Sequence, residues 1–268
     1  MISNLVIFTD LDGTLLDNKT YEPGPALNTL KFCGDNNIPV IFVTAKTRAE
    51  IEPIRHELNN DSPFISENGG GLYLPVDGFK RPENFEKSGD YWCRLSKILI
   101  GDIRPALDHA AEKAEVKVQG FGRMTTAEIA DLTGLDIDRA KLAGAREFDE
   151  PFVIIDETEE KLEAIRNEII RAGYRYDSGG YLHHIMGDFN KGETVNVLIT
   201  IYKRIKPTMK FIGLGDAYND LPMLKLVDYP FLVRRPDGTA DSRVDFEGLT
   251  ITDGIGPLGF VEAVESAL

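Results

Sequence analysis

The 268-residue chain contains only two cysteines, Cys33 and Cys93. Both lie in segments with helix-like apolar spacing, and neither has the partner spacing of a zinc site or a disulfide framework. We therefore expect both to be buried small apolar side chains. Long apolar runs are also lacking, since no segment approaches the roughly 20 residues needed to cross a bilayer. The amino terminus lacks the basic start and apolar stretch of a secretory signal, and these absences together predict a cytoplasmic protein.

Basic residues are scarce, with 30 Lys and Arg against 44 Asp and Glu and a formal charge of -14. Binding to nucleic acid or to an anionic membrane needs a basic surface, so neither is expected as a partner. A small anionic substrate would need a local positive site or a metal. Biased tracts and repeats are absent as well, which together with 42% hydrophobic residues predicts a folded globular protein. No pattern specifies an oligomeric state.

Short apolar runs that end in polar or glycine-rich turns occur at residues 5–9, 39–44, 64–66 and 211–214. Such runs are typical of parallel strands buried on both faces. Segments 25–36 and 48–59 have helical spacing and alternate with them. The alternation predicts an α/β fold with a doubly wound, mostly parallel Rossmann-like sheet, in which ligands bind at the carboxyl ends of the strands.

The pattern changes near residue 81 and resumes near residue 188. Between these points, segments 91–114, 126–132 and 159–172 have helical spacing, and segments 116–118, 152–155, 174–177 and 181–185 resemble strands. The Ser178-Gly179-Gly180 turn predicts a hairpin connection. We therefore expect an α+β module over residues 82–187, inserted into a core formed by residues 1–81 and 188–268.

Two acids follow the first predicted strand in the segment Asp10-Leu11-Asp12-Gly13-Thr14. Because side chains repeat every two residues along a strand, both carboxylates can project the same way. Neighbouring carboxylates repel unless a cation lies beside them, and Mg²⁺ suits oxygen ligands combined with water and phosphate. Gly13 would let the backbone approach a phosphate, with its amide and that of Thr14 as donors.

Two further segments carry a hydroxyl and an ammonium group. Thr44 ends the second predicted strand and can cap the helix that opens through residues 45–47 or bind a phosphoryl oxygen. Taken alone, Thr44 is better explained by capping. Lys191 stands at the start of the helical run 193–202, where its ammonium could hold a carboxylate nucleophile and a phosphoryl group together.

The segment after the strand at 211–214 carries three polar residues. Asp216 stands where a third strand end would deliver another metal ligand. Asn219 and Asp220 could orient the lysine and the metal-bound waters. A glycine-rich loop with a helix cap is the structural alternative for this segment.

Together, DLDGT, VTAKT, NKG and GDAYND have the order and strand-end context of the four motifs of the haloacid dehalogenase (HAD) superfamily, and the chain is identified as a member. The resemblance implies that Asp10 is phosphorylated and that Asp12 protonates the leaving alkoxide and then activates water. It implies Mg²⁺ held by the carboxylates of Asp10 and Asp216 and the backbone carbonyl of Asp12, with Lys191 and Thr44 completing the charge clamp. The inserted module would be a C2B-type cap that closes over the site and recognises the leaving group.

A closer likeness covers nearly the whole chain. Segments 44–50, 66–70, 120–125, 146–151 and 187–192 resemble the mannosyl-3-phosphoglycerate phosphatase family. That family converts its substrate to the compatible solute mannosylglycerate, and related members accept the glucosyl analogue. Ala45 stands where a small hydroxyl residue is expected, so a backbone contact to the phosphate is retained and a side-chain contact is lost.

Several activities remain open on this basis. The sugar is either mannosyl or glucosyl, and a general sugar-phosphate phosphatase would have the same core motifs. A receiver domain is far shorter and does not pair DLDGT with GDAYND. An idle sugar-phosphate-binding protein would have no need for both Asp10 and Asp12.

A substrate with a phosphate and a carboxylate requires cations beyond Lys191. Lys46, Arg48 and Arg146 are the candidates, and Arg146 is the preferred cap contact. Each is equally well explained as a surface cation or ion-pair partner.

Asn68, in the turn Glu67-Asn68-Gly69, is expected to shape the hinge and either to contact sugar hydroxyls or to serve the turn alone. His183 and His184 alternate along a predicted strand, so at most one points into the cleft. Ordinary packing is favoured for both.

Overall fold

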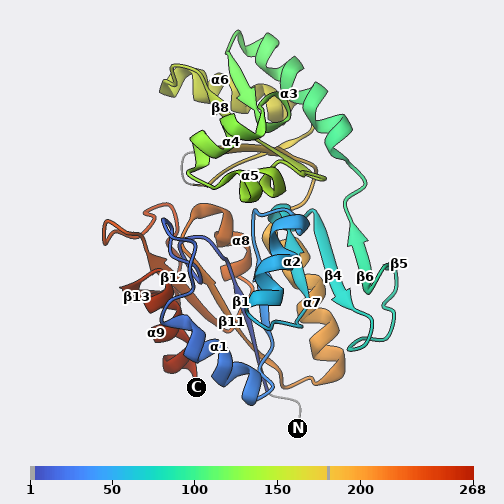
Figure 1. The fold of residues 1–268 in the computed structure, drawn as a ribbon, viewed down its shortest axis with the longest axis vertical. Helices are drawn as coiled ribbons and strands as arrows, with labels where there is room; N and C mark the ends of the chain where they lie inside the picture. The colour runs from blue at the N-terminus through green and yellow to red at the C-terminus, as the bar shows by residue number, and fades with distance from the viewer. Residues whose placement is uncertain (1–3, 180–181) are drawn as a thin grey trace.

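The structure is a computed structural model that describes residues 4–179 and 182–268. The chain forms two lobes, stacked along the long axis in Figure 1. The larger lobe, the core, contains a nine-stranded sheet, and the smaller lobe, the cap, contains a four-stranded sheet. The cap is built from the elements α3 to β10 and lies over one end of the core sheet.

Six parallel strands make up most of the core sheet. In spatial order they are β13 (Thr250–Ile255), β12 (Tyr229–Arg234), β11 (Lys210–Gly215), β1 (Leu5–Thr9), β2 (Val40–Val43) and β3 (Phe64–Ser66). Three antiparallel strands, β4 (Gly71–Pro75), β6 (Tyr91–Leu95) and β5 (Glu86–Ser88), extend the sheet beyond β3. The predicted mostly parallel, doubly wound sheet is confirmed.

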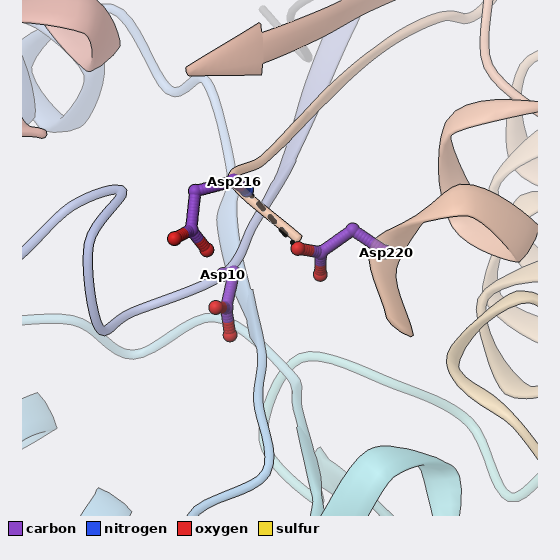
Figure 2. A group of neighbouring side chains, drawn as sticks. All are labelled: Asp10, Asp216 and Asp220. Carbon is purple, nitrogen blue, oxygen red and sulfur yellow. Dashed lines mark hydrogen bonds between the residues drawn. The ribbon is translucent and has the colours of Figure 1, made fainter. Parts of the chain in front are cut away.

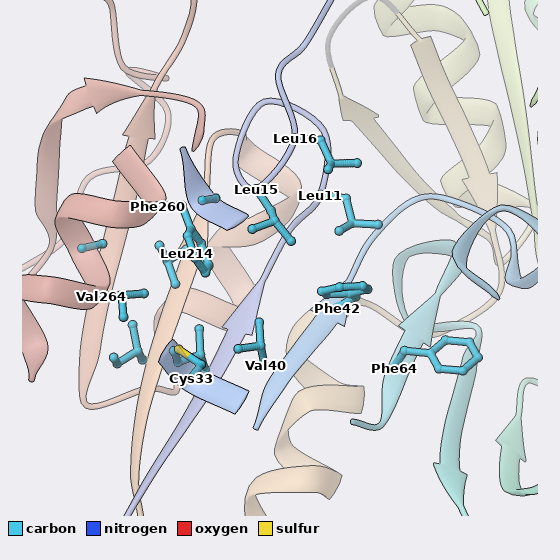
Figure 3. Packing of buried hydrophobic residues seen from close by; sticks show 14 of the residues in the cluster. Leu11, Leu15, Leu16, Cys33, Val40, Phe42, Phe64, Leu214, Phe260 and Val264 are labelled. Atoms are coloured by element: carbon cyan, nitrogen blue, oxygen red, sulfur yellow. The ribbon is translucent and has the colours of Figure 1, made fainter. Parts of the chain in front are cut away.

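Helices cover both faces of this sheet. One face packs against α1 (Ala26–Asp35), α2 (Arg48–Glu57) and α9 (Pro257–Ala267), and the other against α7 (Lys191–Ile205) and α8 (Leu221–Leu224). Successive residues of β1 alternate between the faces, since Ile7 lies in the first cluster and Phe8 in the second. Figure 3 shows the first cluster, where Phe42 and Phe260 lie among aliphatic side chains. Burial of each large side chain contributes roughly 1.5–3 kcal/mol, which explains why the apolar runs form central strands.

The cap is an antiparallel sheet with its two longest helices on one face. Its strands are ordered β7 (Val118–Gly120), β8 (Asp149–Ile154), β10 (Leu182–Met186) and β9 (Arg175–Gly179). Helices α3 (Ile100–Ala114) and α6 (Glu159–Arg171) pack on it through one apolar cluster. Two short helices, α4 (Thr126–Thr133) and α5 (Ile137–Ala143), form a second cluster with Phe121. Thr47 of the core donates to the carbonyl of Leu142 in α5 at 2.9 Å, so α5 contacts the core directly.

Two sequence predictions about this region are corrected by the structure. The segment 91–114 was expected to be helical, but residues 91–95 form β6 and the helix begins only at Ile100. Tyr91 packs edge-on against Phe64 of β3 and Tyr73 of β4, so strand pairing and these aromatic contacts override its helix-like spacing. Cys93 is buried on that strand, whereas Cys33 is buried on α1. Because β5 and β6 pair in the core sheet, the expected boundary between residues 81 and 82 falls inside the core.

The predicted hairpin turn includes Gly180, and the strand predicted at 181–185 includes Tyr181. Both of these residues lie outside the described part of the chain. β9 and β10, on either side, pair antiparallel. Among the helices that the structure describes, none is long and apolar enough to cross a membrane.

Candidate active site

Three predicted site residues stand directly after neighbouring parallel strands. Asp216 follows β11, Asp10 follows β1 and Thr44 follows β2, and these strands are adjacent in the sheet. The amide of Asp10 donates to Leu214 at 2.9 Å, which continues the β1–β11 ladder up to the site. These residues border a cavity of about 340 Å³ between core and cap. Its lining includes Asp10, Asp12, Thr44, Ala45, Lys46, Arg146, His184, Asp216 and Asn219.

The carboxylates of Asp10, Asp216 and Asp220 converge, and one oxygen from each lies within 4.8 Å of the others. Figure 2 shows them arriving from the end of β1, the end of β11 and the turn that precedes α8. Lys191 Nζ lies 3.0 Å from Asp10 Oδ1 and 2.6 Å from Asp220 Oδ1. Asp220 Oδ2 accepts the amides of Asp216 and Ala217, so both of its oxygens are already bonded. The carboxylates left to hold a cation are those of Asp10 and Asp216.

Asp12 is set apart from this group, because its carboxylate pairs with Lys46 at 2.7 Å. The predicted metal contact of Asp12 is its backbone carbonyl, so the pairing with Lys46 involves a different part of the residue.

The buried acids outnumber their lysine. Burial raises the pKa of Asp10 to about 7, with Lys191 opposing the rise and Asp220 and Asp12 adding to it. Burial, then Asp220 and Asp10, also raise the pKa of Asp216. Burial opposes charge on Lys191, but Asp10 and Asp220 outweigh it and raise its pKa. The lysine therefore stays charged, and the surplus negative charge suits a divalent cation with oxygen ligands.

Gly13 and Thr14 do not play the predicted part. The Gly13 amide donates to the carbonyl of Leu16 at 2.9 Å and the Thr14 amide to that of Leu11 at 3.3 Å, and neither residue is among those lining the cavity. The structure gives another reason for glycine at position 13. Its φ is +77°, and a Cβ there would lie 2.7 Å from Asp216 Oδ2. Any side chain at this position would displace a carboxylate of the site.

Thr44 is buried at the cavity but does not cap α2. The helix begins at Arg48, and its N-cap is Thr47, which forms a capping box with Glu50. Thr44 Oγ1 instead accepts the amide of Lys46 at 3.2 Å. The structural explanation that the sequence favoured for Thr44 is therefore wrong, because three residues separate it from the helix.

A sequence profile of haloacid dehalogenase-like hydrolases matches residues 7–75 and 135–253, which is more than half of the chain. The chain belongs to this family. It is 42% identical to the glucosyl-3-phosphoglycerate/mannosyl-3-phosphoglycerate phosphatase of Methanococcoides burtonii, over 97% of this chain and 95% of that protein. It is 33% identical to the mannosyl-3-phosphoglycerate phosphatase of Pyrococcus furiosus, over 85% of this chain and 90% of the relative.

Solved structures have the same fold. A haloacid dehalogenase-like hydrolase from Bacteroides thetaiotaomicron superposes with a TM-score of 0.66 at 18% identity, covering 98% of this chain and 99% of that one. The predicted superfamily, the phosphatase class and the capped α/β fold are confirmed.

In this haloacid dehalogenase-type phosphatase, a buried polar network joins the core to the cap. The Glu67 carboxylate, after β3, accepts the amides of Glu147, Phe148 and Asp149 at 2.8–3.1 Å. Arg146 pairs with Asp149 and donates to the carbonyl of Ala45 at 3.0 Å. Burial disfavours the Asp149 carboxylate, but Arg146 and His184 outweigh it and lower its pKa to about 2. The network therefore fixes the position of the start of β8, in the cap, relative to the VTAKT segment at the end of β2 in the core.

The predicted substrate contacts of the phosphatase separate into two groups. Arg146 and Lys46 line the cavity, whereas Arg48 and Asn68 are not among the lining residues. The Arg48 guanidinium pairs with Glu52 and stacks over two tyrosine rings. Asn68 is buried with a φ of +56°, donates to Asp149 at 3.0 Å and accepts from Asn219 at 3.2 Å. Both are better explained as structural residues than as sugar contacts.

The two histidines also separate, as their alternation predicted. His184 lines the cavity and hydrogen-bonds Asp149 at 3.1 Å, whereas His183 contacts Tyr176 and Glu157.

Sequence reasoning missed Tyr21 and Arg235, which also line the cavity of the phosphatase. Arg235 follows β12, and predicting that strand from the sequence would have placed Arg235 at a strand end. Tyr21 lies in the loop between β1 and α1, where nothing in the sequence distinguishes it from a surface residue.

We expect Glu67→Gln to lower the free energy of unfolding by about 1–3 kcal/mol, because an amide cannot satisfy three converging N–H donors as a carboxylate does. The melting temperature should fall by roughly 2–4 °C for each kcal/mol. Glu112→Gln, at an exposed position on α3, is the matched control and should be neutral. Equal melting temperatures for the two variants would contradict a joining role for Glu67.

Proposed function

We propose that this protein is a Mg²⁺-dependent phosphomonoester hydrolase that acts on glycosyl-3-phosphoglycerates through an aspartyl-phosphate on Asp10. The observation that carries the proposal is the placement of Asp10 against Lys191 and Asp216, beside a cavity that the cap helps to line. The named activity of relatives that match the chain nearly end to end supports the substrate class.

The chemistry assigns a separate part to each acid. The Asp10 carboxylate attacks phosphorus, and the bond from phosphorus to the sugar-glycerate oxygen breaks while Asp12 gives that oxygen a proton. Asp12 then takes a proton from water, whose oxygen attacks the aspartyl-phosphate. The bond from phosphorus to Asp10 breaks, and phosphate leaves. Lys191 keeps its charge throughout and holds the nucleophile in place.

Mg²⁺ would be held by the carboxylates of Asp10 and Asp216 and the backbone carbonyl of Asp12. When bound, it offsets negative charge on the phosphoryl oxygens.

Mannosyl-3-phosphoglycerate is the proposed substrate, with the glucosyl analogue as the alternative. The relative from Methanococcoides burtonii carries both sugars in its name, which favours a chain that accepts either.

Phosphate release from both glycosyl-3-phosphoglycerates, beside mannose and glucose 6-phosphates, tests the assignment. We expect turnover of the first pair in Mg²⁺, little with the second pair, and loss of all release in EDTA. Comparable rates on all four would leave a broad sugar-phosphate phosphatase. A chain that binds the substrates but releases no phosphate in Mg²⁺ would be an idle binding protein.

A further inference from the structure

Lys46 is a firmly held cation that lines the cavity. Its amide donates to Thr44 and its carbonyl accepts the amide of Glu67 at 2.9 Å, so its backbone is held on both sides. Its Nζ lies 2.7 Å from Asp12 Oδ2 and 3.6 Å from Glu50 Oε1, and its side chain is only 9% exposed. A lysine in this setting has one fixed position for its charge rather than a mobile surface one.

The two oxygens of Asp12 have different surroundings. Oδ2 contacts Lys46, whereas Oδ1 is buried and has no hydrogen-bond partner among the described residues. Because an unpartnered buried oxygen is costly, the arrangement suits an oxygen that receives a substrate group. Lys46 thus fixes the carboxylate by one oxygen and leaves the other for the leaving group.

Two other cationic side chains that line the cavity are held by partners other than Asp12. Arg146 is held by Asp149, Glu67 and the carbonyl of Ala45. Arg235 pairs with Asp241 at 2.6 Å and follows β12, on the far side of β1 from the strand that leads to Lys46. The ammonium of Lys46 has three donors, and Asp12 takes one of them at short range.

We propose that Lys46 binds the carboxylate of the glycerate group while it orients Asp12, and so selects phosphate esters with a carboxylate close to the leaving oxygen. This inference rests on the proposed function. In a 3-phosphoglycerate skeleton only two carbon atoms separate the carboxylate carbon from the leaving oxygen. A cation that binds this carboxylate must therefore lie within reach of the acid that protonates that oxygen, and among the cations discussed here only Lys46 directly contacts Asp12.

A matched substrate pair tests this. Glucosyl-3-phosphoglycerate and 2-O-glucosylglycerol 3-phosphate differ only in a carboxylate against a hydroxymethyl group. We expect the native enzyme to prefer the carboxylate, and Lys46→Met to reduce that preference in kcat/KM by roughly 10- to 100-fold, the range of one charge-assisted hydrogen bond. KM should rise for the carboxylate substrate alone, whereas kcat should fall for both substrates because Asp12 is no longer oriented. A general packing defect would not produce this split.

Lys19→Met, at an exposed loop position, is the matched control and should keep the native preference. Binding of both substrates to Asp10→Asn and to Asp10→Asn/Lys46→Met, measured by calorimetry, gives the same comparison if turnover by Lys46→Met is too slow. A native enzyme without preference, an unchanged preference in Lys46→Met, or its loss in Arg235→Met instead would each overturn the inference. If the native enzyme hydrolyses only the mannosyl ester, the same comparison is made with the mannosyl pair, and failure to hydrolyse either glycosyl-3-phosphoglycerate would instead count against the proposed function.

Discussion

Replacing Asp10 with asparagine is expected to reduce phosphate release by at least about 10⁴-fold, because an amide cannot become the phosphoryl acceptor and no neighbouring carboxylate can take its place. Asp220 is bound through both oxygens, and Asp12 is held by Lys46 away from the acid cluster. Release measured with the preferred glycosyl substrate in Mg²⁺ checks this. The exposed Asp35→Asn, whose partner is Lys31, is the matched control. Turnover by Asp10→Asn within tenfold of native would exclude Asp10 as the nucleophile.

The same variant should not lose stability. The pKa of Asp10 is raised from 3.8 to about 7, so between these values the folded protein binds more protons than the unfolded chain. The contribution of Asp10 to the free energy of unfolding therefore falls as pH rises through this window. Above the window, the full cost of burying the ionised carboxylate lowers the stability of the folded protein. In EDTA at pH 8 we expect Asp10→Asn to melt a few degrees above native, by roughly 2–4 °C for each kcal/mol, and near pH 4 we expect the difference to vanish. A lower melting temperature at pH 8 would mean that the Asp10 carboxylate stabilises the fold.

Lys191→Met should damage both stability and activity. Its ammonium is fully buried between Asp10 and Asp220, and removing it leaves buried carboxylates uncompensated. Breaking a buried ion pair in this way costs about 3–5 kcal/mol, or roughly 6–20 °C in melting temperature. Activity should fall by about 10²–10³-fold or more, because the charge beside the nucleophile is lost. Thermal melts and phosphate release measure the two effects.

Two further variants separate the causes. Lys203→Met, at an exposed position on the same helix, should be close to native in both measurements. Adding Asp220→Asn to Lys191→Met removes one uncompensated charge, so it should recover part of the stability and none of the activity. Recovery of activity in the double variant would show that Lys191 serves the fold alone.

The central strands and the order of the site could be predicted because they depend on short-range patterns. The run before Asp10 is apolar on both faces, and Ile7 and Phe8 do pack into opposite clusters. Once the strands are parallel and adjacent, their carboxyl ends must meet, so Asp10, Thr44 and Asp216 converge without further information.

The edges of the sheet could not be read in the same way. Tyr91 and Cys93 have spacing that also fits a helix, and it is pairing with β4 and β5, together with contacts to the rings of Phe64 and Tyr73, that makes this segment a strand. The partners of cations were equally hidden. Lys46, Arg48 and Arg146 look alike in sequence, yet one contacts Asp12, one stacks on tyrosines and one joins cap to core.

The amino-acid sequence by itself determined the central strands of the sheet, the residues at their ends and the chemistry those residues can perform, because periodicity and residue type act locally. Only the tertiary structure decided which oxygen of each acid is free, which glycine makes room for a carboxylate and which cation lies beside the proton donor. These properties depend on atoms from distant segments meeting within a few ångströms, and no local pattern encodes such distances.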